Sequence, residues 1–290
     1  MSIGDKKYRI EYSQNRMRSR ALIGKLLEKS SITKGDLVYD IGAGCGIISE
    51  ELAKRQARVI AIEQDNELFN RLKQKLGDSL LVTLRHGDFL AESLPSRARY
   101  KVFANIPFVA TADIVRKLLF SQNPPDDCYL VMQREAARKF AGIPTETLFS
   151  LLLKPWFELS ILYAFRRTDF FPVPNIEIVL MQAERRKLAL VAAEHTHTYR
   201  DFVLYGFSQA KPTLKNALQE VFTYPQFTRL SRDLGFRPES SPSDLSFPQW
   251  LGLFSFFSKR GDRGRRDLIS VSGERLRRQQ NHLKKIHRTR

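Results

Sequence analysis

The sequence has little cysteine and no long apolar run. Its two cysteines, Cys45 and Cys128, cannot form a disulfide framework, which excludes the small disulfide-rich secreted proteins and predicts a reducing cytoplasm. No stretch approaches the roughly 20 apolar residues of a membrane helix. The first eleven residues are polar and charged, unlike a secretory signal. The sequence therefore predicts a globular cytoplasmic protein that makes no membrane contact.

Acidic residues are also scarce. The chain has 31 Asp and Glu against 48 Lys and Arg, a formal charge of +17 over 290 residues. Residues 185–290 hold 21 basic and 9 acidic residues, a net +12, and residues 259–290 hold 12 and 3. An excess of this size is typical of proteins that bind a polyanion, and it predicts a nucleic-acid partner. For the last 30 residues alone, a solvated tail is the alternative interpretation.

Short apolar stretches alternate with helical patterns in the first part of the chain. Leu68, Leu72 and Leu76, for example, recur every four residues on one helix face. Strands that alternate with helices of this length predict βαβ units and a mainly parallel sheet. The seven predicted strands are residues 37–41, 58–62, 80–84, 100–104, 129–132, 158–165 and 176–182.

The pattern changes near Glu184, after which only helical stretches are predicted. These are residues 199–210, 213–222, 226–234 and 247–258. We therefore predict a catalytic domain over residues 1–184, a smaller all-helical RNA-binding domain over 185–260, and a basic tail over 261–290.

Polar and glycine-rich motifs follow four of the predicted strands. Asp40-Ile41-Gly42-Ala43-Gly44-Cys45-Gly46 follows the first strand, and its glycines allow a sharp turn and close approach of a ligand. Glu63 ends the second strand, where a carboxylate can accept hydrogen bonds from both ribose hydroxyls of a nucleoside. Nicotinamide dehydrogenases share these two features, so the glycine loop and Glu63 alone do not identify the cofactor.

Two further motifs narrow the choice. Asp88 and Phe89 follow the third strand, where the carboxylate can accept from the adenine amine and the ring can pack on the base. Asn105-Ile106-Pro107-Phe108 follows the fourth strand and suits a planar amine: the Asn105 side-chain oxygen and the Pro107 carbonyl accept from its NH₂ group, and Phe108 stacks on its ring. The carboxyl ends of parallel strands meet in one crevice, so we expect all four motifs to converge.

With these motifs, the sequence resembles the S-adenosylmethionine-dependent rRNA adenine N6-methyltransferases, and within them the Erm group of macrolide-lincosamide-streptogramin B resistance enzymes. The resemblance covers roughly residues 8–258. It includes Ser13-Gln14-Asn15 and the later stretch Phe170-Phe171-Pro172-Val173-Pro174-Asn175-Ile176. Position 16 departs from the pattern, because Arg stands where the family usually has an aromatic or apolar residue.

The resemblance implies a Rossmann-like class I methyltransferase fold and S-adenosylmethionine as the cofactor. It implies that Phe170 lies across the target base, with Asn105, Pro107 and Phe108 as the other catalytic residues. The cofactor-binding residues that it implies are Gln14, Asn15, Met17, Gly42, Ala43, Gly44, Glu63, Asp88, Phe89 and Asn105.

The resemblance also implies the substrate, an adenine of 23S rRNA as naked RNA or ribosome precursor. The alternatives are a KsgA-type dimethyltransferase of 16S rRNA and a non-catalytic RNA-binding assembly factor on the same scaffold. The KsgA-type pattern has a Gly-Gln-Asn start and an Asn-Leu-Pro-Tyr core. This chain has Ser-Gln-Asn and Asn-Ile-Pro-Phe at these places, and both motifs resemble the Erm group more. We predict no metal site, because His195 and His197 have no third ligand nearby. A monomer is expected, since no heptad pattern appears.

Overall fold

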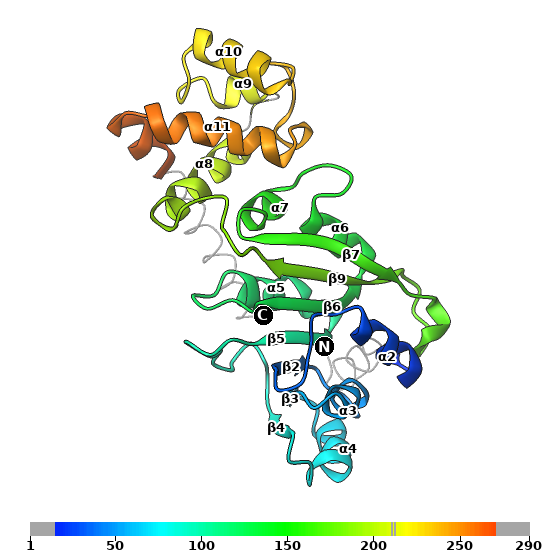
Figure 1. Cartoon of the computed structure of the whole chain (residues 1–290). Coiled ribbons are helices and arrows are strands. Elements are labelled where there is room, and N and C mark those ends of the chain that lie inside the picture. The colour runs from blue at the N-terminus through cyan, green and yellow to red at the C-terminus, as the bar shows by residue number, and fades with distance from the viewer. Residues whose placement is uncertain (1–14, 210, 212, 271–290) are drawn as a thin grey trace, which may run out of the picture. The chain divides into compact units, whose positions relative to one another are not determined.

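A computed structural model describes residues 15–209, 211 and 213–270. Its central feature is a seven-stranded sheet in the order β4-β3-β2-β5-β6-β9-β7 (Figure 1). Strands β2 to β6 are parallel to their neighbours, and β9 is antiparallel to β6. The predicted mainly parallel sheet is therefore confirmed. The strands are β2 (Leu37–Ile41), β3 (Arg58–Glu63), β4 (Val82–His86), β5 (Lys101–Asn105), β6 (Asp127–Gln133), β7 (Phe157–Ala164) and β9 (Ile178–Arg185).

Helices connect the parallel strands as crossovers. They are α3 (Ile47–Lys54) after β2, α4 (Asn66–Leu76) after β3, and α5 (Thr111–Leu119) after β5. Helix α4 has a side-chain N-cap: the Asp65 side chain accepts from the Leu68 backbone N–H at 2.9 Å, which satisfies one free donor of the first turn. The leucines predicted to share one face of α4 are all buried.

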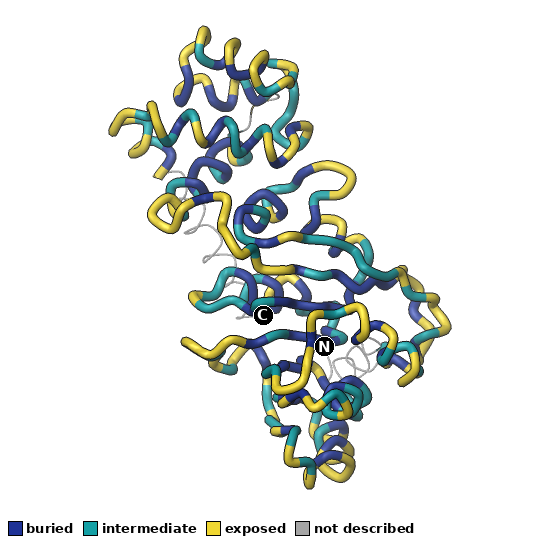
Figure 2. Tube along the Cα trace, viewed as in Figure 1, coloured by how far each residue is buried: buried dark blue, intermediate teal, exposed yellow. Residues whose placement is uncertain are grey.

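One face of the sheet packs against three helices in an apolar core cluster. Helices α2 (Arg20–Glu28), α3 and α4 pack their apolar faces against alternate residues of the strands, which point to the same side of a sheet. Figure 2 shows the central strands as buried along most of their length. Core residues from the helices and strands include Ile23, Leu26, Leu27, Ile48, Leu52, Leu72, Val38, Val59, Phe103, Val131 and Leu180.

The third strand lies two residues later than the predicted 80–84. Leu80 is fully exposed, and the chain is still turning there, with Ser79 N–H bonded to the Leu76 carbonyl and Val82 N–H to the Ser79 carbonyl. The prediction of this boundary was wrong because an apolar run does not reveal where a turn releases the chain into the sheet. The shift places His86 opposite Glu63.

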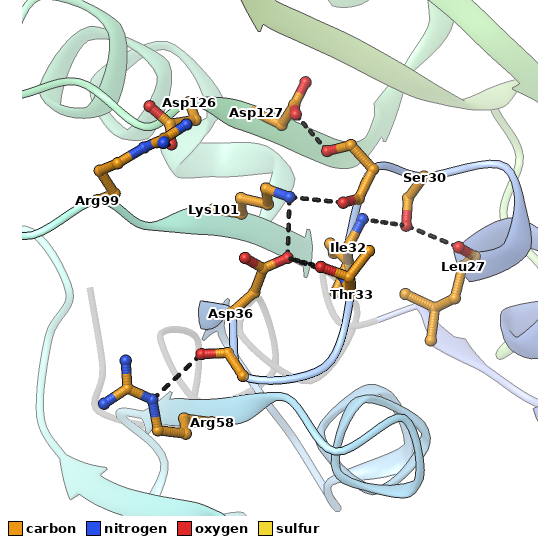
Figure 3. A network of polar contacts seen from close by, with 12 residues as sticks. Leu27, Ser30, Ile32, Thr33, Asp36, Arg58, Arg99, Lys101, Asp126 and Asp127 are labelled. Atoms are coloured by element: carbon orange, nitrogen blue, oxygen red, sulfur yellow. Dashed lines mark hydrogen bonds and ion pairs between the residues drawn. The ribbon is translucent and has the colours of Figure 1, made fainter.

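A polar network fixes the amino ends of the strands (Figure 3). Lys101 at the start of β5 donates to the Ser31 carbonyl at 2.5 Å and to Asp36 Oδ2 at 2.9 Å. The same oxygen of Asp36 accepts from the Thr33 N–H at 2.7 Å, and Ser31 donates to Asp127. Burial opposes ionisation of Asp36, but the bonds from Lys101 and Thr33 outweigh it and lower the pKa of Asp36. Hydrogen bonds and an ion pair between neighbouring side chains thus stabilise the amino ends of the strands.

The chain forms two compact units. One comprises Met1–Arg138 and Glu158–Arg185, and the other comprises Lys139–Phe157 and Arg186–Arg290. The second unit contains α7 (Leu148–Leu153), α8 (Thr196–Ser208), α9 (Leu214–Ala217), α10 (Tyr224–Leu234) and α11 (Phe247–Arg260); α6 (Arg134–Ala141) spans the division. The segment 139–157 groups with the later helices because buried Glu146 accepts from the Phe247 N–H at 3.2 Å. The chain crosses between the units after Arg138, Phe157 and Arg185, and the predicted domain bounds stay a prediction.

Aromatic side chains form the core of the second unit, as its helical sequence patterns require. Phe202 of α8 packs against Trp250 and Phe257 of α11, with ring centroids 6.0 and 5.2 Å apart. Gly206 permits this approach, because a Cβ there would lie 2.6 Å from Trp250 Cη2. Residues 263–270 are helical as well. No helix in the described ranges is long and apolar enough to cross a membrane.

Candidate active site

A cavity of about 430 Å³ lies at the carboxyl ends of the parallel strands. Its size falls in the usual range for small-ligand sites. Gly42 follows β2, Glu63 ends β3, Asp88 follows β4, and Asn105 ends β5, so the structure brings the four predicted motifs together. The predicted residues that line this cavity are Asn15, Gly42, Gly44, Glu63, Asp88, Phe89, Asn105, Pro107 and Phe108.

Glu63 is held rigidly in the cavity wall. Its side chain is buried, and its two carboxylate oxygens accept from the Gly44 N–H at 2.7 Å and the Asp65 N–H at 2.8 Å. Each oxygen keeps a further lone pair, so both can also accept from ligand hydroxyls. The arrangement suits a vicinal diol such as a ribose.

The glycine loop is bonded to the end of β3. The N–H groups of Gly42 and Ala43 both donate to the Ile62 carbonyl, at 2.9 and 3.0 Å. Gly42 has φ +69°, and a Cβ there would lie 3.5 Å from Pro107 Cδ. A side chain at this position would be strained because φ is positive, and its Cβ would be in contact with the 105–108 turn. The loop therefore contributes backbone and open space to the cavity.

Asp40 lies fully buried behind the loop. Its Oδ2 accepts from the Ser49 hydroxyl at 2.6 Å, while Oδ1 has no partner in the described structure. Burial raises the pKa of Asp40 to about 7, and the charge of Glu63 acts in the same direction. Burial thus shifts the carboxyl group toward its neutral form.

Asp88, Phe89 and Leu90 line the cavity, and a lysine that the sequence analysis missed is bonded to this segment. Phe89 is buried, and Asp88 Oδ1 accepts from the Leu90 N–H at 2.8 Å, which leaves Oδ2 for a ligand. Lys117 of α5 donates to the carbonyls of Phe89 at 2.6 Å, Leu90 at 2.9 Å and Glu92, and its Nζ lies 4.9 Å from the Phe89 ring centroid. Burial lowers the pKa of Lys117. No motif signals this role, since a lysine on an amphipathic helix is expected to face solvent.

Asn105 has its amide orientation fixed by the N-terminal segment. Its Nδ2 donates to the Asn15 carbonyl at 2.7 Å, so Oδ1 is the atom left to accept from a ligand. Asn15 thus acts through its backbone, although the sequence motif drew attention to its side chain.

The other acceptor of the turn is partly engaged. The Pro107 carbonyl accepts from the Ala110 N–H at 3.0 Å, which closes a short helical turn over Phe108–Ala110. A carbonyl has two lone pairs, so Pro107 can accept once more. Ile106 lines the same cavity, which makes its carbonyl a second candidate. Phe108 is half-buried against the core and lines the cavity.

Three predicted residues do not lie in this cavity. Phe170 is fully buried in β8 (Phe170–Phe171), which pairs with β1 (Arg16–Met17), and its ring centroid is 5.2 Å from that of Phe165. The structure thus places this ring in the core, and its stacking on a target base stays a prediction. Met17, opposite Phe170, is also buried, and with Ala43 it lines a neighbouring cavity. Gln14 lies outside the described residues.

The cavity fits the predicted S-adenosylmethionine. Buried Glu63 suits the ribose hydroxyls, and Asp88 with Phe89 suits the adenine amine and ring. Gly42 keeps the space beside Asn105 open. Among the described residues, no group of three His, Cys, Asp or Glu side chains is placed to hold a metal ion.

Comparisons with known proteins place the chain among rRNA methyltransferases. An rRNA adenine N-6-methyltransferase from Bacillus licheniformis is 26% identical over 245 residues, covering 83% of this chain and 84% of that protein. Ribosomal RNA small subunit methyltransferase A from Nostoc punctiforme is 27% identical over 264 residues, covering 83% and 92%. The crystal structure of the 23S rRNA methyltransferase ErmE has the same fold, with a TM-score of 0.78 and 24% identity over 84% of this chain and all of that one.

A family model described as ribosomal RNA adenine dimethylase matches residues 5–259, which include every element of the site. The methyl donor of this family is S-adenosylmethionine, in agreement with the cavity. The chain therefore belongs to the ribosomal RNA adenine dimethylase family and is an enzyme that methylates adenine in ribosomal RNA.

Proposed function

We propose that the protein methylates N6 of a specific adenine in 23S rRNA and thereby gives resistance to macrolides, lincosamides and streptogramin B. The family establishes the reaction class, and the choice of rRNA is the step proposed here. Two motifs support it: the Ser13-Gln14-Asn15 start and the core Asn105–Phe108 both resemble the Erm group more than the KsgA group.

The fixed amide of Asn105 is the observation that carries the proposed chemistry. The N6 lone pair of adenine is delocalised into the ring, which makes the amine a poor nucleophile. Asn105 Oδ1 and a main-chain carbonyl of the same turn, Pro107 or Ile106, accept from the two amine hydrogens. Two acceptors favour a pyramidal nitrogen whose lone pair is free to react, and their dipoles are already in place before the reaction.

Phe108 provides the surface on which the extruded base stacks, and stacking of this kind is worth roughly 1–3 kcal/mol per base. S-adenosylmethionine supplies an electrophilic methyl group. No general base is required, because the methylated ammonium is strongly acidic and gives its proton to water. Glu63, Asp88 and Phe89 hold the cofactor's nucleoside.

The charge distribution supports separate parts of the chain for catalysis and for RNA binding. Residues 1–184 carry the catalytic motifs, and residues 185–260, which group with residues 139–157 in the second unit, form a helical RNA-binding domain. The basic tail, residues 261–290, adds affinity for the phosphate backbone. The enzyme acts as a monomer on naked 23S rRNA or on a ribosome precursor.

Mapping of the modified nucleotide tests the proposal. The protein is expressed in a macrolide-sensitive bacterium, with Asn105→Ala as the matched inactive variant, and rRNA digests are analysed by mass spectrometry. The expected result is N6-methyladenine in 23S rRNA and growth on erythromycin only with the wild-type protein. Methylation confined to 16S rRNA, without resistance, would reject the proposal.

That second result is the prediction of the alternative function, a KsgA-type methyltransferase of 16S rRNA. Relatives named ribosomal RNA small subunit methyltransferase A are 27 and 28% identical to this chain, as similar as those named rRNA adenine N-6-methyltransferase. Primer extension on both rRNAs from the same cells separates the two functions, because methylation that blocks reverse transcription stops the primer on one template only.

A further inference from the structure

A second cavity adjoins the candidate active site. It has a volume of about 370 Å³ and shares Arg16, Gly42, Gly44 and Asn105 with the first cavity. Its remaining wall includes three more cationic side chains, Arg18, Arg20 and Lys75. A strongly basic cavity therefore opens beside the residue that holds the reacting amine.

The four cations differ in how far they are neutralised. Arg20 and Lys75 both pair with Glu50, at 2.9 and 2.6 Å. Arg16 and Arg18 form no ion pair with a carboxylate in the described part of the chain. The nearest polar partner of Arg16 is the sulfur of Cys45, 4.0 Å from its Nη1. Among the described residues, no carboxylate therefore competes with a ligand for these two arginines.

The pairing of β1 with β8 aims these side chains outward. Met17 lies opposite Phe170, and both are buried. Successive side chains of a strand point to opposite faces, so Arg16 and its partner Phe171 point to the exposed face. Phe171 is 65% exposed, and the Arg18 guanidinium lies 5.9 Å from its ring centroid. Figure 2 shows the segment that leads into α2 as largely exposed.

An RNA substrate carries anions close to its reacting base. A target adenine that reaches Asn105 brings its own sugar and phosphates to the mouth of the cavity. Guanidinium groups bind phosphate oxygens with paired donors, and an aromatic ring holds an arginine in place without neutralising it. Arg16 lines both cavities, so it lies beside the amine site and beside the solvent-facing mouth.

We propose that Arg16 and Arg18, the latter supported by Phe171, form a phosphate-binding site for the RNA backbone next to the target adenosine. This site would account for the arginine at position 16, where the family pattern has an apolar residue. The inference requires only the family's activity on rRNA and holds for a target in either ribosomal subunit.

Salt-dependent RNA binding tests the site. Arg16→Ala, Arg18→Ala and the conservative Arg16→Lys are compared with Arg58→Ala, a control at the opposite, amino end of β3. The probe is deproteinised total rRNA, containing both 16S and 23S species, in filter binding from 50 to 300 mM KCl. Each alanine variant is expected to weaken binding about tenfold at low salt and to reduce the slope of log Kd against log salt by about 0.7–0.9. Arg16→Lys should recover the slope, and Arg58→Ala should match the wild type.

Cofactor binding measured by calorimetry without RNA completes the test. The affinity of the alanine variants for S-adenosylmethionine should stay within twofold of the wild-type value, and their melting temperatures should be unchanged. An unaltered salt slope in Arg16→Ala and Arg18→Ala would overturn the site. So would a tenfold loss of cofactor affinity with a wild-type slope, because the arginines would then bind the cofactor's carboxylate. Since the probe contains both rRNAs, an error in the proposed 23S target leaves this result unaffected.

Discussion

Replacement of Asn105 tests the proposed chemistry most directly. Asn105→Ala removes the acceptor that faces the amine and also the donor to the Asn15 carbonyl, a bond of 2.7 Å. The loss of one pre-placed acceptor in a transition state typically costs about 2.7–4 kcal/mol, a factor of roughly 10² to 10³ in kcat. We expect a loss of this size, with affinity for S-adenosylmethionine within a few-fold of wild type, because Glu63 and Phe89 remain in place.

Asn105→Asp separates the two functions of the amide. The carboxylate keeps an oxygen that can accept from the amine, but it cannot donate to the Asn15 carbonyl, so two oxygens face each other. Leaving that carbonyl without a donor costs about 1–3 kcal/mol and displaces the side chain. Asn105→Asp should therefore also lose at least tenfold in kcat, although it still presents an acceptor.

Transfer of a tritiated methyl group to deproteinised rRNA, at saturating cofactor, measures both effects. The ratio of kcat/KM values converts directly into lost transition-state stabilisation. If Asn105→Ala kept more than a tenth of wild-type activity, the acceptor role would be refuted. If Asn105→Asp were fully active, the bond to Asn15 would have no part in positioning.

Three further predictions follow from the buried groups. Lys117→Met should weaken cofactor binding about tenfold in calorimetry, with kcat changed less than threefold, because the loop 88–92 loses the donor to three carbonyls. In the folded protein, Asp40 stays protonated to about pH 7, but in the unfolded chain it ionises near 3.8, so its contribution to stability falls as pH rises between these values. In urea unfolding, the difference in unfolding free energy between Asp40→Asn and wild type should therefore grow by about 3 kcal/mol in favour of the variant from pH 5 to pH 8. Gly206→Ala should lose about 1–3 kcal/mol in the same assay, because the added Cβ meets the Trp250 ring at 2.6 Å.

Each of these predictions has a built-in comparison. Gly24→Ala on α2 is the control for Gly206→Ala, because a Cβ there meets nothing within 4 Å, and it should be neutral or stabilising. A difference between Asp40→Asn and wild type that stayed constant with pH would contradict the raised pKa of Asp40. Unchanged cofactor affinity in Lys117→Met would show that loop 88–92 keeps its conformation without the bonds from Lys117.

The convergence of the four motifs at the strand ends could be predicted from the sequence, because it depends on local patterns. Apolar stretches and helix faces mark βαβ units, and the handedness and order of such units bring their carboxyl ends to one edge. Glu63, Asp88 and Asn105 therefore converge as predicted, each at or just after the end of its strand. The boundary of β4 was predicted wrongly, because the turn at Leu80 depends on backbone bonds that apolar periodicity does not encode.

Other features were decided only by contacts between distant parts of the chain. The amide orientation of Asn105 depends on Asn15, 90 residues away, and the burial of Phe170 depends on its pairing with Met17. Segment 139–157 joins the C-terminal helices through a bond between Glu146 and Phe247. Residue types and spacing thus determined which groups reach the site, and tertiary packing determined which atom of each group faces the ligand, because a side chain's free donors and acceptors are those that distant neighbours leave unused.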